Sequence, residues 1–383
     1  MADNETDAAL ATLRRVLEET RHLDRRAFLR RLGQAAAGSA LLGSFVGLIE
    51  ARNADAAEQK PVTTLGWGGA WQAAMETAFF KPWTEKTGNA VRYIAPYDFN
   101  KVRAMDMAKQ QQVDVIEAGS IDTPRLVRFG MNAPLDWKVI DRSALSPGQL
   151  KYANAIGAIT LSTLMVYNKK KWPGEDHPNS WADFWDIQRY PGPRSLQRRC
   201  LTTLEAALMA DGVPADPAKM YPLDVDRAFR KLDQIKPHIK TWWSSGTEPQ
   251  QFMQDEEVDL CMAWNGRASD SINNHGAHYD IVWNQACYNG DVEAWFLLRN
   301  CPNPDGGMKL LDFVGRAEPQ AAFARALYYG PTNLKAYDLI DEKLARQLPS
   351  YPANANVSLL VNYDWWVDHY DELTMRFETW IQS

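Results

Sequence analysis

The stretch from Val62 to Trp71 reads Val-Thr-Thr-Leu-Gly-Trp-Gly-Gly-Ala-Trp, and it decides the fold class. The residues from Val62 to Gly66 predict a strand, and the glycines that follow predict a loop. A helix comes next, because apolar side chains recur on one face before the chain reaches Gly88: Ala73, Phe79, Phe80 and Trp83. A strand, a glycine-rich loop and a helix in this order predict the first unit of an α/β sheet.

The alternation of strands and helices continues along the chain. Residues 91–94 predict a second strand, 101–112 a helix and 113–118 a third strand. Strands that are separated by helices predict a parallel sheet with crossover helices. The β-prone run from Ile156 to Lys169 comes where a first domain would be nearly complete, so we expect this run to pass between two domains.

A second α/β region is predicted over residues 170–285, and a helical region over 305–383. Between them, Asp280–Cys287 and Asp291–Arg299 predict two strands. The Asn289-Gly290 pair between these strands is typical of a tight turn, so the sequence predicts a hairpin here.

Length and charge limit the classes of function. The chain has 383 residues, enough for two domains with separate cores, and a net charge of -6. This charge gives no basic footprint, so nucleic acid is not an expected partner. No metal or cofactor is expected, because the four cysteines form no CxxC pair, His275 and His278 have no third ligand nearby, and no nucleotide fingerprint occurs. The cysteines leave one disulfide or none as equal alternatives.

The first 56 residues have the pattern of an export signal. Arg25 and Arg26 are followed by Phe28-Leu29, and a weakly apolar stretch from Leu32 to Ile49 comes next. The small-residue sequence that ends at Ala56 predicts the cleavage site. The motif resembles a twin-arginine signal, although Asp24 stands where Ser or Thr is usual. We therefore expect export to the periplasm by the Tat machinery, which carries folded proteins, and a soluble mature chain.

Further along the chain, five motifs in order resemble the periplasmic spermidine/putrescine-binding proteins. They are the opening strand with its tryptophan-bearing loop, the helix end at Thr87-Gly88, Ser180–Trp185, Met262–Gly266, and Gly307–Ala336 with its Tyr329–Leu334 loop. The resemblance covers nearly all of residues 61–383. It implies a solute-binding protein of an ABC importer that docks on a membrane permease and is not an enzyme.

The family resemblance also implies an architecture. It is the α/β, two-lobed periplasmic binding protein fold, class II-like, with a hinge between the lobes. We expect lobe 1 to comprise residues 61–160 and 290–335, and lobe 2 to comprise 161–289 and 336–383. A small amino compound would lie between the lobes of a monomer.

Aromatic positions of the family's ligand site persist in this sequence. We expect ligand contacts from Trp67 or Trp71 in the first loop, Trp243 ahead of a Ser-Ser-Gly loop, Trp264 and Tyr329. Such rings would cover the methylene groups of a ligand and attract its ammonium group. The alternative for each ring is ordinary core packing.

The carboxylates that the family uses for cationic ligands do not persist as a set. Arg199 and Thr202 stand where the resemblance implies an acidic pair, and Arg267 follows the Trp-Asn-Gly motif. Glu293, beside Trp295, stands near the other family carboxylate, with Asp291 as the alternative. Arginine forms bidentate pairs with carboxylates and repels ammonium groups.

The exchange of charges predicts a zwitterionic ligand. Arg267, with Arg199 as a second candidate, would bind the carboxylate of an ω-amino acid such as 4-aminobutyrate, and Glu293 its amine. The structural alternatives are that Arg267 lies on the surface or caps a helix starting at Ala268, that Arg199 is solvated, and that Glu293 is an exposed hairpin residue. The functional alternatives are a polyamine-binding protein and a secreted enzyme that is loaded with a cofactor before export.

Overall fold

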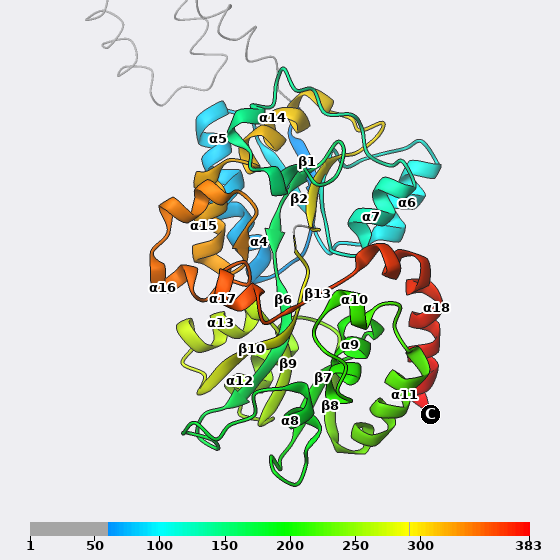
Figure 1. Ribbon diagram of the computed structural model, residues 1–383. Coiled ribbons are helices and arrows are strands. Elements are labelled where there is room, and N and C mark those ends of the chain that lie inside the picture. The colour runs from blue at the N-terminus through cyan, green and yellow to red at the C-terminus, as the bar shows by residue number, and fades with distance from the viewer. Residues whose placement is uncertain (1–59, 291) are drawn as a thin grey trace, which may run out of the picture. The chain divides into compact units, whose positions relative to one another are not determined.

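The computed structural model of the chain describes residues 60–290 and 292–383 (Figure 1). The predicted signal peptide, its cleavage site at Ala56 and the alternative site residue Asp291 lie outside the described residues. Within the described part the strands form two large sheets, each covered by helices on both faces. We call the five-stranded sheet with its helices lobe 1 and the six-stranded sheet with its helices lobe 2.

The sheet of lobe 1 has the order β2-β1-β3-β11-β4. Its strands are β1 (Val62–Leu65), β2 (Val91–Ile94), β3 (Val115–Ala118), β4 (Ile156–Gly157) and β11 (Ala294–Leu297). β1 is parallel to β2 and β3, as the alternation of strands and helices predicts, whereas β11 runs antiparallel to β3 and β4. β1, β3 and β11 are buried along their whole length, which is typical of strands that are covered on both faces.

Helices cover lobe 1 on both faces. On one face lie α4 (Ala70–Met75), the π-helical turn η1 (Glu76–Phe80), α5 (Lys81–Thr87), α14 (Pro304–Val314) and α15 (Ala317–Leu327). On the other face lie α6 (Phe99–Met107) and α7 (Asp122–Arg128). The first helix ends at Gly88 in a left-handed conformation, as expected for a glycine stop.

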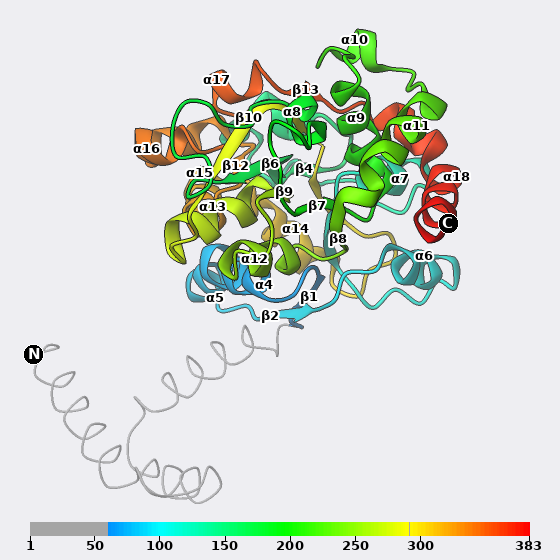
Figure 2. The same cartoon turned by 90° about the horizontal axis from the view of Figure 1, so that it is seen from below.

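The sheet of lobe 2 has the order β13-β10-β6-β9-β7-β8. Its strands are β6 (Ser162–Asn168), β7 (Arg194–Gln197), β8 (Ile239–Trp243), β9 (Leu260–Trp264), β10 (Tyr279–Tyr288) and β13 (Leu359–Leu360). α9 (Cys200–Ala210), α11 (Val225–Ile235) and α18 (Tyr363–Gln382) lie on one side, and α12 (Thr247–Gln254) and α13 (Asn265–Asn274) on the other (Figure 2). The short elements α8 (Trp181–Trp185), α10 (Pro217–Met220) and η4 (Lys236–His238) complete this lobe.

The chain crosses between the lobes three times, and two of these crossings lie side by side. The first runs from β4 through β5 (Ile159–Thr160) to β6, so the run from Ile156 to Lys169 does pass from one sheet to the other. The second runs from β10 to β11. Residues of the two segments are hydrogen-bonded to each other: Leu161 exchanges bonds with Asn289, and the Ala158 amide donates to the Glu293 carbonyl at 2.8 Å.

The predicted hairpin at Asn289-Gly290 is wrong. β10 pairs with β6 and β13 in lobe 2, whereas β11 pairs with β3 and β4 in lobe 1, so the two strands do not pair with each other. Gly290 has the positive φ of 61° that a tight turn also requires. The local sequence therefore favours a change of direction, and the partners in the two sheets decide that it becomes a crossing between lobes.

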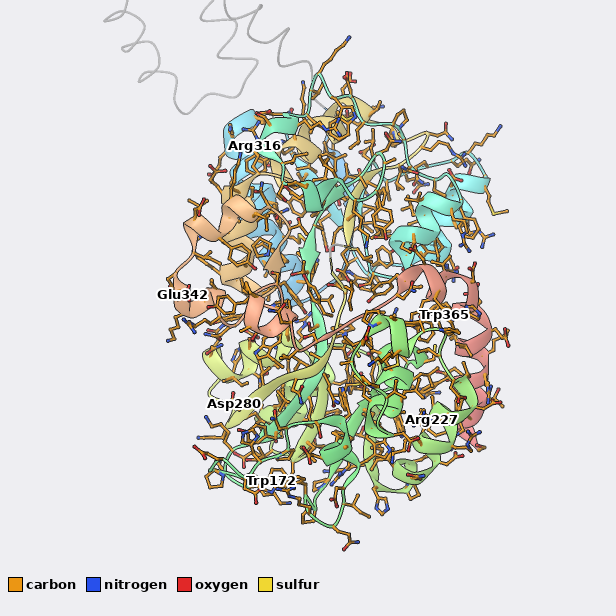
Figure 3. The ribbon with its side chains drawn as sticks, viewed as in Figure 1. Trp172, Arg227, Asp280, Arg316, Glu342 and Trp365 are labelled. Carbon is orange, nitrogen blue, oxygen red and sulfur yellow. The ribbon has the colours of Figure 1, made fainter. Side chains whose placement is uncertain are left out.

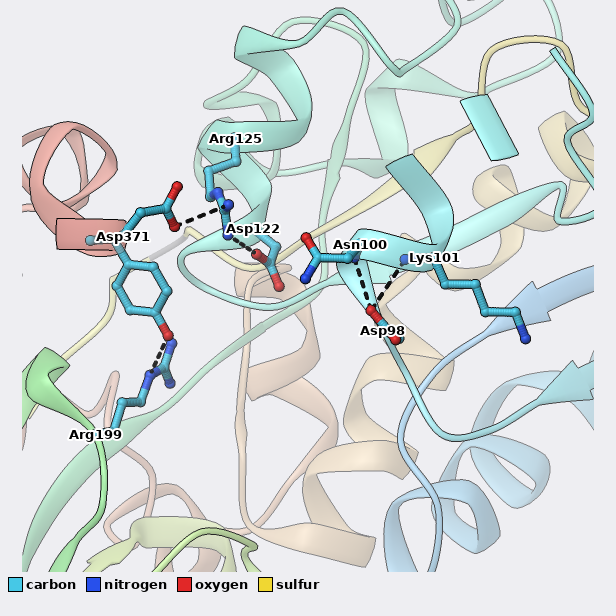
Figure 4. Close-up of polar contacts among 8 residues, drawn as sticks. Asp98, Asn100, Lys101, Asp122, Arg125, Arg199 and Asp371 are labelled. Atoms are coloured by element: carbon cyan, nitrogen blue, oxygen red, sulfur yellow. Dashed lines mark hydrogen bonds and ion pairs between the residues drawn. The ribbon is translucent and has the colours of Figure 1, made fainter. Parts of the chain in front are cut away.

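The C-terminal region is mainly helical, as predicted, and it contacts both lobes. After α15 come β12 (Gly330–Pro331), η5 (Leu334–Leu339), α16 (Glu342–Ala345) and α17 (Pro352–Ala355), and Leu344 packs on Ala324 of α15. α18 packs on α9 of lobe 2, while two of its aspartates pair with α7 of lobe 1. These pairs are Arg125–Asp371 at 3.3 Å and Arg128–Asp368 at 2.6 Å, the first of which is drawn in Figure 4.

Large aromatic and aliphatic side chains fill the interiors of the lobes. Trp83 and Phe79 are buried in lobe 1, and Trp181 and Trp366 are buried in lobe 2. The side chains labelled in Figure 3 lie mainly at the periphery, with Arg316 between α14 and α15 and Arg227 on α11. These buried tryptophans therefore belong to the cores of the lobes.

The structure also bears on cysteines, metals and membranes. Cys200, Cys261 and Cys287 are buried free thiols, and Cys301 is a half-buried one. Residues 60–290 and 292–383 contain no cluster of His, Cys, Asp and Glu that would hold a metal ion. In the same two ranges, none of the helices is apolar and long enough to cross a membrane.

Candidate ligand-binding site

Glu293 lies where the chain re-enters lobe 1 ahead of β11. Its Oε1 accepts hydrogen bonds from the Ser120 amide at 3.2 Å and from the Ser120 hydroxyl at 2.5 Å. The side chain is 5% exposed, so the alternative of an exposed hairpin residue is wrong. Burial raises the pKa of Glu293 to about 7, against the lowering effects of Ser120 and of the Arg199 guanidinium.

A second buried carboxylate, Glu117, lies beside Glu293. Glu117 is on β3 directly opposite Trp295 of β11, two residues beyond Glu293. The side chain is 1% exposed, and neither of its oxygens has a hydrogen-bond partner in the described part of the chain. Burial first, and then the charge of Glu293, hold the pKa of Glu117 well above its usual value.

Glu117 is not among the residues that the sequence predicts for the site. A signal for it was present, because a glutamate in the otherwise apolar run from Val115 to Ala118 breaks the pattern of a buried strand. The family motifs did not point to this position. Only the pairing of β3 with β11 brings Glu117 next to Glu293.

Arg199 lies near the acidic side chains of Asp122 and Glu293. Its Nε donates to the Tyr370 hydroxyl at 3.3 Å (Figure 4), and its positive charge lowers the pKa of both Asp122 and Glu293. Burial nevertheless keeps the pKa of Asp122 above its usual value. The structure thus differs from the expectation that Arg199 assists Arg267, because Arg199 balances the carboxylates. Arg199 also lines a pocket of about 210 Å³ with Cys200 and Ser244.

Tyr329 lies near charged groups of both signs, because Arg267 and Glu293 both influence its pKa. Trp71 is buried, and its ring centroid is 5.3 Å from that of Tyr329. The Trp71 Nε1 is an orphan donor within residues 60–290 and 292–383. Trp67 is 38% exposed and packs on Tyr97 with a centroid distance of 4.5 Å. Both tryptophans therefore lie near the site, with Trp71 deeper.

Arg267 lies in the first turn of α13 in lobe 2. It is 6% exposed, so the alternative of a surface residue is wrong, and α13 begins at Asn265 rather than at Ala268. Its Nη1 donates to Gln250 at 3.2 Å, while its Nε is buried with no partner among the residues that the structure describes. Burial raises the pKa of Tyr329 to about 12, and the neighbouring Arg267 opposes that rise.

Trp264 and Gly246 form the wall behind Arg267. A Cβ atom at Gly246 would lie 2.8 Å from the Trp264 ring and 3.1 Å from the Arg267 Nε, so the glycine backbone packs tightly on both side chains. Trp243 meets Trp264 edge-on at 5.3 Å. Trp243 itself is fully buried and its Nε1 donates to the Met262 carbonyl at 2.7 Å, as expected for a core residue behind Trp264.

Trp295 is also a core residue of lobe 1, and its ring packs on Phe79 at 5.9 Å. Its Nε1 is buried without a partner in the described ranges, on the same strand pair as Glu117. Indole nitrogens only donate hydrogen bonds, and buried donors are normally satisfied. Unpaired donors and acceptors in one region indicate a place for a polar molecule.

Asn265, at the start of the helix that carries Arg267, forms a hydrogen bond to lobe 1. Its Oδ1 accepts from the Ser162 amide at 2.9 Å, and its Nδ2 donates to the Tyr328 carbonyl at 2.8 Å. The site residues therefore run from the carboxylates of Glu117 and Glu293, past Tyr329 with Trp71, to Arg267. Negative charge at one end, aromatic rings between and positive charge at the other suit a short molecule that carries both an amine and a carboxylate.

Comparison with known proteins identifies the class. Residues 78–356 match the family described as bacterial extracellular solute-binding protein, and the chain belongs to this family. Its function is therefore that of an extracellular solute-binding protein, a component of transport.

Two curated proteins differ in their similarity to this chain. The gamma-aminobutyric acid-binding protein of Pseudomonas aeruginosa is 34% identical over 346 residues, which is 88% of this chain and 95% of that protein. The spermidine/putrescine-binding periplasmic protein of Escherichia coli is 25% identical over 186 residues, 49% of this chain and 51% of that protein. The similarity to the first protein thus extends over nearly twice as much of the chain.

Two solved structures share the fold over most of the chain. An ABC transporter substrate-binding protein from Bradyrhizobium japonicum has a TM-score of 0.77 and 35% identity, covering 84% of this chain and 99% of that one. The Atu4243-GABA receptor has a TM-score of 0.76 and 31% identity, covering 84% of this chain and 98% of that one. These similarities confirm the periplasmic binding protein fold.

Proposed function

We propose that this protein is the substrate-binding component of an ABC importer for an ω-amino acid, with 4-aminobutyrate as the ligand that suits the site best. The observation that carries the proposal is the pair of buried opposite charges, Glu293 in lobe 1 and Arg267 in lobe 2, with Tyr329 next to both. The ammonium group would bind at Glu293, and the carboxylate would pair with the guanidinium of Arg267.

The comparisons support this choice of ligand. One relative that aligns with 88% of the chain is a gamma-aminobutyric acid-binding protein, and one structural neighbour is a GABA receptor. A polyamine fits less well. Its second ammonium group would lie beside the buried guanidinium of Arg267, which repels a positive charge.

Capture would occur by closure of the two lobes on a hinge. The proposed hinge is where Ala158 bonds Glu293 and Leu161 bonds Asn289, because these residues lie in the two segments that join the sheets side by side. We propose the lobe bounds 61–160 with 290–335 and 161–289 with 336–383, which agree with the strands of each sheet. The segment around Leu344 is the exception, because it packs on α15 of lobe 1.

Partners and location complete the proposal. The loaded monomer would deliver its ligand to a membrane permease, in keeping with the ABC transporter substrate-binding protein among its structural neighbours. Export by the Tat machinery to the periplasm, with cleavage after Ala56, is proposed from the Arg25-Arg26 motif alone.

A thermal shift experiment tests the ligand. The protein is heated with 4-aminobutyrate, common amino acids, putrescine or spermidine, because a ligand that binds only the native state raises the melting temperature. At a hundredfold excess over Kd, the stabilisation is about 2.7 kcal/mol. A shift with 4-aminobutyrate and a smaller one with putrescine supports the proposal. Stabilisation by putrescine and by no carboxylate would refute it.

A further inference from the structure

We infer that Glu117 is the second carboxylate of the ammonium site, and that Glu117 and Glu293 together release a proton to solvent when a cationic head group binds between them. The inference rests on the proposed function, because it assumes a ligand with an ammonium group. It adds a residue that the sequence motifs did not select and a link between ligand binding and pH.

The first support is the unsatisfied state of Glu117. Its side chain is 1% exposed, and both oxygens are without hydrogen-bond partners in the part of the chain that the structure describes. A buried carboxylate normally has donors around it, because an ionised group without them is costly. An ammonium group offers up to three donors and a positive charge, which is what this carboxylate lacks.

The second support is the place of Glu117 in the sheet. Antiparallel pairing sets Glu117 opposite Trp295 and Ala118 opposite Ala294, so Glu293 is the diagonal neighbour of Glu117 at the end of the strand pair. The two differ in their partners, since Ser120 donates twice to Glu293 and no donor reaches Glu117 within the described ranges. Glu293 is therefore held in place, and Glu117 is the one that is left for a ligand.

The third support is the chemistry of two adjacent buried carboxyl groups. Two negative charges in a site of low polarity repel each other, so the empty site keeps a proton on one of them. The raised pKa values of Glu117 and Glu293 agree with this state. A bound ammonium group supplies positive charge in place of that proton, which then leaves to the buffer.

Other titratable and charged groups surround the pair. Tyr93 on β2 and Tyr97 in the next loop carry pKa values that Glu117 helps to raise, which places both phenols near it. The remaining neighbours are Asp122 on α7, Arg199 at the start of α9, Arg267 on α13, Tyr329 in the loop ahead of β12 and Tyr363 on α18. Of these groups, only Arg199 and Arg267 stabilise ionised carboxylates. Each of them also donates a hydrogen bond to another residue, Arg199 to Tyr370 and Arg267 to Gln250.

Calorimetry of the full chain tests the inference. 4-Aminobutyrate is titrated into the protein at pH 8, where Glu293 with its pKa of about 7 is already mostly ionised, in buffers with different ionisation enthalpies, which gives the number of protons released. We expect release approaching about one proton. Because binding releases a proton, the association constant should increase as the pH is raised, by up to about tenfold per pH unit while the empty pair still holds that proton. Glu117→Gln should bind roughly tenfold more weakly or worse, with almost no proton release.

Glu205→Gln is the matched control. Glu205 is also buried with a raised pKa, but Tyr221 and Trp366 donate to it in the core of lobe 2. This variant should bind 4-aminobutyrate and release protons as the unaltered protein does. If Glu117→Gln does not fold, the unaltered protein still decides, because binding without proton release overturns the inference.

The outcomes separate this inference from the proposed function. Full proton release and unchanged affinity in Glu117→Gln would overturn the role of Glu117 and leave the ligand intact. Binding of putrescine but not of 4-aminobutyrate, with proton release that Glu117→Gln abolishes, would refute the proposed ligand and support Glu117. Binding of neither compound would overturn both.

Discussion

Ser120 donates to one oxygen of Glu293 twice, through its amide at 3.2 Å and through its hydroxyl at 2.5 Å. Ser120 follows β3 and Glu293 precedes β11, so 173 positions of sequence separate the two residues. The contact fixes the carboxylate at the point where the chain crosses back into lobe 1. It leaves the other oxygen of Glu293 for a ligand.

Removal of the hydroxyl should therefore weaken ligand binding. We expect Ser120→Ala to lower the affinity for 4-aminobutyrate by about tenfold, since a hydrogen bond to a charged group contributes about 1.5–3 kcal/mol. Calorimetric titration measures the change. Ser143→Ala removes a hydroxyl that donates to Asp141 at 2.6 Å on an exposed loop, and it should leave the affinity unchanged. Equal affinities for both variants would contradict the role of Ser120.

Arg267 should decide whether a carboxylate binds. We expect Arg267→Ala to weaken binding of 4-aminobutyrate by at least about a hundredfold, because the loss of one partner of a buried charge pair costs about 2–5 kcal/mol. Arg346→Ala, which removes an arginine whose side chain is 64% exposed, is the control and should bind normally. A circular dichroism melt of each variant checks the fold. Unchanged affinity in a folded Arg267→Ala would remove this residue from the site.

Gly246 offers a test of the wall behind the ligand. A Cβ atom there would meet the Trp264 ring at 2.8 Å, closer than a normal van der Waals contact. We expect Gly246→Ala to displace Trp264 and Arg267 and to weaken binding by about tenfold or more, because small displacements of positioning groups have large effects. Gly174→Ala, with no atom within 4 Å of the new methyl group, should bind as the unaltered protein does.

The pKa of Glu293 predicts how stability depends on pH without ligand. The value of about 7 in the folded protein exceeds the usual 4.5, so unfolding releases a proton between these pH values. Stability should therefore fall as the pH rises from 4.5 to 7. Urea unfolding at pH 5 and pH 8 should show a smaller loss in Glu293→Gln than in the unaltered protein. An equal loss in both would contradict the raised pKa.

The thiol count is a simple check of the described structure. Cys200, Cys261, Cys287 and Cys301 are all free, although an exported protein meets conditions that allow disulfides. We expect a thiol reagent to find four reactive groups in the denatured protein without reductant, and few in the native one. A count of two would indicate one disulfide, the alternative that the sequence left open.

The sequence predicted the strand and helix order of lobe 1 well, because hydrophobic periodicity and glycine stops are local signals. It also proposed Glu293 and Arg267 as ligand contacts; the structure buries both, and their role stays a prediction. It failed at Asn289-Gly290, where the local signal for a tight turn is the same in a hairpin and in a crossing between sheets. The sequence shows a glutamate in a buried strand at position 117, but only the pairing of β3 with β11 shows that this glutamate lies next to Glu293.

The alternation of strands and helices that begins with Val62–Trp71 determined the α/β class from the sequence, because alternating strands and helices can bury their apolar faces only as a layered sheet. The resemblance to the polyamine-binding family, together with the residue types at its site positions, also predicted that a cation and an anion share the site. Tertiary structure decided which of the charged residues lie close to one another. Arg199 lies with Glu293 rather than with Arg267, and Glu117 lies beside Glu293, since register and crossings between sheets join residues that are far apart in the sequence.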